Sequence, residues 1–279
     1  MRRILALLAS LLLAVTPAMA DYVDSGGQLH VNQPRACRDN PAEPYPPWVI
    51  KLVEPVAEPF GRAAAHVVWR HGRIGRRSDA MALLARTLRP LDIVLTKSNG
   101  RLTGHLIPGQ FAHAVVYLGG EKDLKALGVW SDPAVKPHHA AIRAGRVYVE
   151  ALSSRDKLSP LNKAIDADQL VVLRTGLGKT ARARAARGYF AHLGVPYDFH
   201  MDAGESEALF CAELVDHVMA LGLPRREQYG RTTIVPAEIA AAALAGKGGL
   251  SFVLYLKADR DGWLKGDRAM LKRDIEAGW

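Results

Sequence analysis

The chain has 279 residues, of which 49% are hydrophobic and 23% charged, a composition typical of a globular protein. Its formal net charge is +9, but the basic residues are scattered and lack the interleaved aromatic residues of a nucleic-acid-binding platform. A solvated charged face explains this charge best, and a modest peripheral attraction to an anionic envelope surface is the alternative.

Residues 1–20 have the three parts of a secretory signal peptide. Two arginines form a basic start, residues 4–15 are an apolar run, and residues 18–20 read Ala-Met-Ala, a small-residue cleavage signal. The apolar run is too short for a transmembrane helix, and no later stretch is long and apolar enough to span a bilayer. We therefore expect a mature protein that starts near Asp21, carries a net charge of +7 (9 − 2 for the two arginines) and is periplasmic or secreted.

The chain contains two cysteines, Cys37 and Cys211. In an oxidising compartment a pair of cysteines favours one disulfide. Cys37 lies in a polar, proline-flanked segment without hydrophobic periodicity, whereas Cys211 lies in a strongly patterned one. A structural disulfide and a reactive Cys211 thiol therefore both remain open at this point.

Residues 21–89 are expected to form an irregular lead-in followed by N-terminal helices. Residues 48–71 repeat apolar positions at three- and four-residue steps, and Pro55 and Pro59 favour a kink or two short helices. Ser78 is a candidate N-cap for a helix over residues 79–88. The region carries no chemical motif.

From residue 90 the pattern changes to short strands followed by helices. We expect strands over residues 91–96, 112–118, 146–152, 169–174 and 251–256, and helices over residues 179–193, 208–219 and 236–245. The segment 121–145 reads as an irregular insertion. This order favours an α+β fold with a mainly antiparallel sheet in one domain over residues 90–257, followed by a basic C-terminal tail over 258–279.

The helix expected over residues 208–219 carries Cys211 in its first turn. Leu214, Val215 and Val218 follow the cysteine at the spacing of one helical face, so the thiol is expected on the core side. Glu213 and Asp216 are expected on the polar side. A helix N-terminus supplies free N–H groups and a positive dipole end, and both favour a thiolate, the reactive form of cysteine.

A nucleophilic cysteine needs a base and a group that orients the base. Among ten histidines, His113 stands out because it opens a strand beside a glycine-containing loop, while His105 is a weaker candidate in that loop. Glu150 lies within a strand, where it could accept the second imidazole N–H of the histidine. A half-buried core histidine and a solvent-facing edge-strand glutamate are the alternatives. No metal-ligand spacing, nucleophile elbow or phosphate-binding glycine loop is found, so no cofactor is expected.

Five segments, in this order, resemble the permuted papain-like amidases of the YiiX/YaeF type, within the NlpC superfamily of cysteine hydrolases. Residues 91–96 resemble the opening Gly-Asp-Ile/Leu strand, although Leu91 replaces the usual glycine. Residues 111–119 are similar to the segment that carries the family histidine, with Ala112 where serine is common. Residues 148–152 resemble the Val-x-Glu-Ala strand, 195–199 the Lys-Pro-Tyr-Asp turn, and 209–215 the Cys-Ser/Ala-Glu-Leu-Val helix.

The resemblance implies a papain-like fold and a Cys-His-Glu triad made of Cys211, His113 and Glu150. Cys211 would attack a carbonyl through a thioester intermediate, His113 would accept and return the proton, and Glu150 would orient the imidazole. The Cys211 N–H would stabilise the oxyanion, with Tyr197 of the family turn as a tentative further donor; an ordinary packing role for Tyr197 is the alternative. Glu213 matches the family motif and is interpreted as structural.

Three functions remain open from the sequence. The first is an exported amidase acting on an amide bond, for example in a cell-wall peptide. The second is a lipid acyl hydrolase or acyltransferase of the same superfamily. The third, from a different class, is a non-catalytic envelope binding protein in which Cys37 and Cys211 form a disulfide.

Overall fold

A computed structural model of the protein describes residues 54–107, 109–153, 156–204, 207–228 and 231–278, together with residues 22–23, 29–30 and 48. The expected signal peptide and Cys37 lie outside the described residues. The short strands β1 (Tyr22–Val23) and β2 (Leu29–His30) pair with each other in antiparallel fashion, apart from the main sheet. No described helix is long and apolar enough to cross a membrane.

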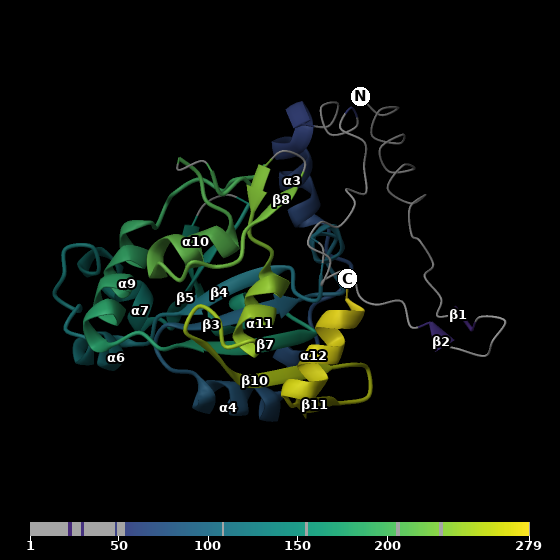
Figure 1. Ribbon diagram of the computed structural model, residues 1–279. Helices are drawn as coiled ribbons and strands as arrows, with labels where there is room; N and C mark the ends of the chain where they lie inside the picture. Colours follow the sequence, from purple (N-terminus) through teal and green to yellow (C-terminus); the bar gives the residue numbers. More distant parts are fainter. Residues whose placement is uncertain are drawn as a thin grey trace.

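The centre of the molecule is a seven-stranded sheet (Figure 1). Its strands, in spatial order, are β11 (Trp263–Gly266), β10 (Leu250–Ala258), β7 (Gln169–Thr175), β3 (Asp92–Lys97), β4 (His113–Tyr117), β5 (Arg146–Ala151) and β6 (Asp156–Pro160). Every neighbouring pair is antiparallel. The expected α+β class with a mainly antiparallel sheet is therefore confirmed.

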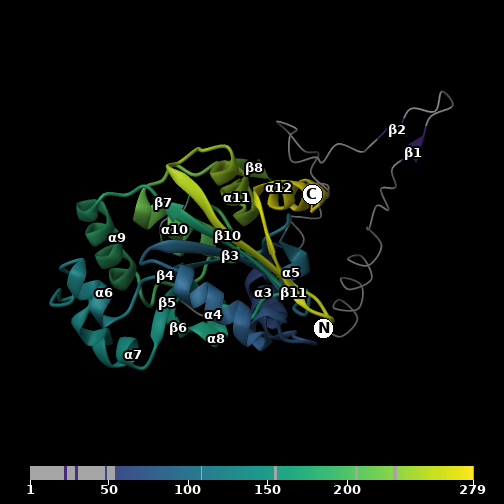
Figure 2. The same ribbon diagram turned by 90° about the horizontal axis from the view of Figure 1, so that it is seen from below.

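Helices cover both faces of the sheet (Figures 1 and 2). One face packs against α9 (Lys179–Ala191), α10 (Cys211–Met219), α11 (Pro236–Leu244) and α12 (Arg268–Ala277), and the other against η3 (Ile74–Arg76), α4 (Ser78–Thr87) and α8 (Leu161–Ala164). Because both faces are covered, the first five residues of β3 are all buried. On β5, Val149 and Ala151 belong to one core and Tyr148 to the other, as the period-two alternation predicts.

The remaining elements of the sheet domain and its lead-in are short. They are η2 (Glu54–Val56), α3 (Ala57–His66), α5 (Thr103–Leu106), α6 (Glu121–Ala126), η4 (Lys136–His138), α7 (His139–Arg143), β8 (Arg226–Gln228) and β9 (Arg231–Thr233). The insertion at 121–145, expected to be irregular, is thus largely helical, because residues such as Leu124 and Ile142 reach the main core. Strand β6 was not anticipated, and the segment expected as a basic tail forms β11 and α12.

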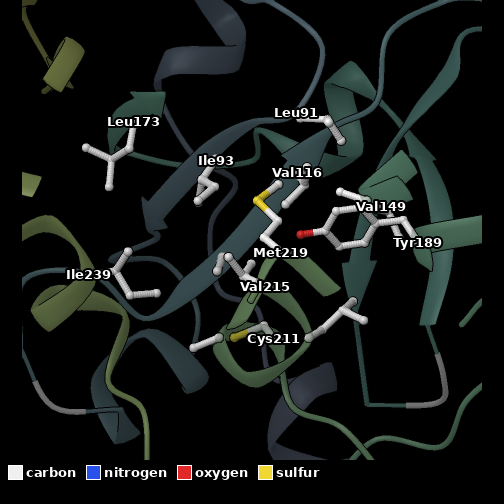
Figure 3. Packing of buried hydrophobic residues seen from close by; sticks show 14 of the residues in the cluster. Leu91, Ile93, Val116, Val149, Leu173, Tyr189, Cys211, Val215, Met219 and Ile239 are labelled. Atoms are coloured by element: carbon white, nitrogen blue, oxygen red, sulfur yellow. The ribbon is translucent and has the colours of Figure 1, made fainter. Parts of the chain in front are cut away.

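The core on the α10 face is built around the helix that carries Cys211 (Figure 3). Cys211, Val215 and Met219 lie along one side of α10 and point toward the sheet, where Ile93 and Val116 belong to the same cluster. The i, i+4, i+8 spacing of the three helix residues gives one continuous apolar stripe. The expected core-facing position of the cysteine is confirmed, since its side chain is 1% exposed.

Two bidentate ion pairs order the sheet and join it to the segment that follows α3. The guanidinium of Arg70 binds both carboxylate oxygens of Asp168, at 2.7 and 2.9 Å, just before β7. Arg174 on β7 binds both oxygens of Asp92 on β3, at 2.8 and 2.7 Å. Such bidentate pairs set geometry as well as charge balance. Ser78 is the first residue of α4 and makes no side-chain capping bond, so its expected capping role is wrong.

Leu91 occupies a strained backbone conformation at the entrance to β3. Its φ is +68°, in the left-handed region that favours glycine, and its side chain is 1% exposed. The backbone N–H donates to Tyr117 O at 2.6 Å, which holds the residue against β4. The family resemblance places a glycine at this position, and the backbone here explains why glycine suits it.

Candidate active site

Cys211 is the first residue of α10. The preceding Phe210 has extended φ and ψ and acts as N-cap, and its N–H donates to the Glu213 carboxylate, which reaches back from the third helical position at 3.4 Å. This is the carboxylate half of a capping box. At the first helical position the Cys211 N–H has no intrahelical acceptor. Cys211 is free of any disulfide in the structure.

His113 and Glu150 come from neighbouring strands of the sheet. His113 is the first residue of β4, opposite Thr96 of β3, and Glu150 is the penultimate residue of β5. The imidazole Nε2 lies 2.8 Å from Glu150 Oε2, with the histidine side chain 25% exposed and the glutamate side chain 4% exposed. A buried carboxylate requires such a partner, which excludes the solvent-facing alternative for Glu150.

The electrostatics of His113 join it to both Cys211 and Glu150. Burial alone would lower the pKa of the imidazole, but hydrogen bonds and charge interactions with Cys211 and Glu150 outweigh burial and raise the pKa to about 10. Burial likewise works to raise the pKa of Glu150, yet the hydrogen bond and charge of His113, a hydrogen bond from Ser159 and the charge of Lys157 lower it. His113 is therefore the element that links the thiol to the carboxylate.

Tyr197 lies beside the cysteine because the chain around it pairs with the residues before α10. Tyr197 and Leu209 form a parallel bridge; Leu209 N donates to Pro196 O at 3.0 Å and Asp198 N donates to Leu209 O at 3.3 Å. Burial raises the pKa of the Tyr197 hydroxyl, and the negative charges of Cys211 and Asp198 raise it further, so the hydroxyl keeps its proton. The structure thus brings all four of the expected site residues to the start of α10.

The acids that follow Cys211 are buried, contrary to the expectation that they lie on a polar face. Glu213 is 5% exposed and Asp216 is 6% exposed. Burial raises the pKa of Glu213 to about 8, and the charges of Asp198 and Asp202 add to the effect. Asp216 accepts from Leu223 N at 2.9 Å. Both carboxyl groups are buried because each accepts a hydrogen bond from a backbone N–H, that of Phe210 for Glu213 and that of Leu223 for Asp216.

A large cavity of about 1020 Å³ opens beside the His113–Glu150 pair. Tyr197 and Thr96 also line it. Cys211 is not among the lining residues, but its neighbours His113 and Tyr197 are. Much of the remaining wall is apolar and is contributed by Val56, Ala57, Phe60, Ala64, Ala65, Leu106, Ile107, Leu152, Leu158, Pro160, Phe199 and Met201. A cavity of this size lies at the upper limit of small-molecule sites, which have volumes of about 300–1,000 Å³.

Helix α3 forms one wall of the cavity, a role that its sequence did not reveal. Gly61 faces the ring of Phe199 so closely that a Cβ at this position would lie 2.4 Å from Phe199 Cδ1. The Arg62 guanidinium lies over the same ring, 5.7 Å from its centre. Glycine is needed here for close approach rather than for its backbone angles. The apolar period of this segment predicted a helix, but nothing local identifies the surface it covers.

Sequence reasoning also missed Ser159 and Lys157, because β6 was not anticipated. Several other described histidines take part in local contacts: His105 stacks on Trp69, His139 on Trp130, His138 on Phe190, and His192 contacts His217. His71 lies 2.9 Å from Asp166, and His66 lines the cavity. Nε2 of His105, the weaker candidate, donates to the backbone carbonyl Asn99 O at 3.1 Å, and His105 is not part of the site. In the described part of the chain no group of three or more His, Cys, Asp or Glu side chains could hold a metal ion.

Comparison with known proteins gives one family match. The model of the family described as permuted papain-like amidase enzyme, YaeF/YiiX, matches residues 87–248, which include Cys211, His113, Glu150 and Tyr197. No curated protein and no solved structure matches the chain.

Proposed function

Since the chain belongs to the permuted papain-like amidase family, whose members are hydrolases, we propose that it is a cysteine hydrolase with Cys211 as the nucleophile. One observation carries the proposal: His113 interacts with the Cys211 side chain while its Nε2 lies 2.8 Å from Glu150. A nucleophile, a base and an orienting carboxylate in contact are the arrangement that nucleophilic catalysis requires.

The proton movements follow from this arrangement. Because Nε2 faces Glu150, Nδ1 is the ring nitrogen left for the thiol. At neutral pH the raised pKa of His113 keeps the imidazole protonated, so that the ring can give a proton to a leaving group. In the proposed mechanism the nucleophile is the Cys211 thiolate beside the imidazolium, and the Glu150 carboxylate balances the second N–H of the ring.

Acylation and deacylation then use the same three groups. The Cys211 sulfur attacks the substrate carbonyl carbon, and the carbonyl electrons move to oxygen. As the tetrahedral intermediate collapses, the bond to the leaving group breaks and His113 Nδ1 gives that group its proton, leaving a thioester. His113, now neutral, takes a proton from the water that attacks the thioester. Collapse of the second tetrahedral intermediate breaks the carbon–sulfur bond and releases the acid and the Cys211 thiolate, while the imidazole keeps the proton it took from water.

The oxyanion needs donors at the start of α10. The Cys211 N–H supports this role because it has no intrahelical acceptor and lies at the positive end of the helix. The Tyr197 hydroxyl is the second proposed donor, since it lies next to Cys211, lines the cavity and keeps its proton.

Within this proposal the scissile bond is an amide, for example in a cell-wall peptide, as the family description suggests. A second candidate is an acyl ester or amide of a lipid, because the cavity beside His113 has a largely apolar wall that would accommodate an acyl chain. We also propose that residues 1–20 direct export, so that the enzyme works in the cell envelope.

The direct test compares mature wild-type protein with Cys211→Ala and Cys37→Ala on two substrate panels, peptidoglycan fragments and acyl lipids. We expect hydrolysis by wild type and Cys37→Ala, none above background by Cys211→Ala, and a thioester adduct on Cys211 when the reaction is quenched with acid and analysed by mass spectrometry. Full activity in Cys211→Ala would overturn the proposal. Titration of free thiols in native protein distinguishes the two hypotheses. We expect two free thiols if the protein is the enzyme, and none if it is a binding protein in which Cys37 and Cys211 form a disulfide.

A further inference from the structure

The charged side chains that line the cavity are mostly cationic. Besides the imidazolium of His113, the cations are Arg62, Arg101, Arg146, Lys157 and Lys163, and the acids are Glu150 and Asp166. A cavity with apolar walls and this excess of positive charge attracts negatively charged ligands, because the low-dielectric walls focus the field. The excess of positive charge therefore indicates that the substrate is negatively charged.

Both acids and two of the cations already have partners. Glu150 binds His113, and Arg101 binds Asp166 at 2.5 Å. Arg62 binds Glu58 at 2.5 Å. In the described part of the chain this leaves Arg146, Lys157 and Lys163 exposed and without an acidic partner within ion-pair distance. We name these three residues the cationic rim.

The cationic rim comes from one continuous part of the fold. Arg146 opens β5 and is in register with Pro160 at the end of β6, and Lys163 follows three residues later on α8. Lys157 is directly opposite Glu150, so the two side chains leave the sheet on the same face. The charge of Lys157 reaches Glu150, since it lowers the pKa of that carboxylate. The rim thus borders the cavity on the side of the His113–Glu150 pair.

We propose that the cationic rim binds an anionic group of the substrate, a carboxylate or a phosphate, while the apolar wall of the same cavity holds its hydrocarbon part. This inference rests on the proposed hydrolase and specifies the substrate class of that site as an anionic amphiphile. It makes Arg146, Lys157 and Lys163 specificity-determining residues that act in binding.

The first experiment measures binding without turnover. Cys211→Ala protein is titrated calorimetrically with octanoate, octyl phosphate and octanamide, three probes of equal chain length that differ in headgroup. We expect at least one of the two anions to bind at least fivefold more tightly than octanamide. This ratio of affinities should decrease as the salt concentration is raised. Preference between octanoate and octyl phosphate distinguishes a carboxylate from a phosphate substrate.

The matched variant removes the rim in the same background through Arg146→Gln, Lys157→Gln and Lys163→Gln. The control removes the same charge from exposed cations outside the cavity lining, through Lys122→Gln, Lys265→Gln and Arg273→Gln. We expect the rim variant to lose the anion preference and to keep its affinity for octanamide, and the control to keep both. Equal effects of the two variants on anion binding, or no anion preference in the parent, would overturn the proposal.

A turnover assay separates this inference from the proposed function. Protein with Cys211 intact is tested on the p-nitrophenyl esters of butyrate and of succinate, which carry a neutral and an anionic acyl group. We expect the rim variant to raise KM for the succinate ester about fivefold relative to the butyrate ester. If neither ester nor any panel substrate is hydrolysed, the hydrolase proposal fails, while the calorimetric result still decides whether the rim binds anions.

Discussion

His113 Nε2 and Glu150 Oε2 lie 2.8 Å apart although the two residues are not opposite each other in the β4–β5 ladder. The register pairs Val116 with Val149 and Tyr117 with Tyr148. When this register is continued along the two strands, His113 and Glu150 are diagonal neighbours on the same face of the sheet. Diagonal neighbours are within reach of long side chains. The contact therefore depends on the register, and a slip of one residue would place the two side chains on opposite faces.

The pKa of His113 is the most direct test of its contacts. We expect an NMR titration of the His113 ring to give a pKa well above 6.5, near the value of about 10 that Cys211 and Glu150 produce together. In Cys211→Ala the pKa should fall, because the thiolate charge and its hydrogen bond are lost while burial still disfavours the cation. An unchanged pKa in that variant would show that the thiol does not interact with the ring.

The linkage of this pKa to folding has a definite sign. A pKa raised in the folded state stabilises the fold at low pH, below the ordinary histidine value, and the contribution is lost as the pH rises toward 10. We therefore expect the substitution His113→Gln to lower the free energy of unfolding more at pH 6 than at pH 10, as measured by urea denaturation.

Removing the charge of Glu150 should affect catalysis more than folding. Glu150→Gln keeps the shape of the side chain but no longer balances the imidazolium, so we expect kcat to fall about 10²–10⁴-fold on whichever substrate the panels identify. Glu121→Gln, at an ion pair on the surface, is the control and should leave kcat unchanged. Wild-type kcat in Glu150→Gln would remove this carboxylate from the mechanism.

Glu213 should tolerate loss of its charge but not loss of its side chain. Its pKa of about 8 keeps it mostly protonated at pH 7, and its oxygen accepts from Phe210 N. We expect Glu213→Gln to match wild type at pH 4, where folded and unfolded glutamate are both largely protonated, and Glu213→Ala to lose about 1 kcal/mol of unfolding free energy with the cap. Because an unfolded glutamate ionises near pH 4.5 whereas folded Glu213 keeps its proton up to about pH 8, wild type should lose stability relative to Glu213→Gln as the pH rises from about 4.5 to 8.

Asp156 predicts a second pH-dependent change in stability. Its carboxylate is buried, neither oxygen has a hydrogen-bond partner, and burial raises its pKa to about 7. A raised carboxyl pKa favours folding at low pH and costs stability as the pH rises through 7. We expect Asp156→Asn to be stabilised relative to wild type at pH 8 by up to about 4 kcal/mol and by much less at pH 5. Asp261→Asn, at an exposed loop position, should show no such difference.

Leu91 should reverse the usual ranking of alanine and glycine. Both Leu91→Ala and Leu91→Gly lose a buried side chain, but only glycine relieves the backbone at φ +68°. We expect Leu91→Gly to be more stable than Leu91→Ala by about 1 kcal/mol in urea denaturation. A less stable glycine variant would show that this position carries no backbone strain.

The sequence by itself determined the local features of this protein. Short β-type runs identified the strands that carry His113 and Glu150. The helical period placed Cys211 at the start of a helix with its thiol toward the core, because these patterns depend on neighbours along the chain. Tertiary structure decided what lies beside them. The register of β4 and β5, the burial of Glu213, the unanticipated strand with Lys157 and the wall formed by α3 all arise from contacts between distant segments. No local pattern records such contacts, because the free energy that fixes them comes from surfaces buried between elements.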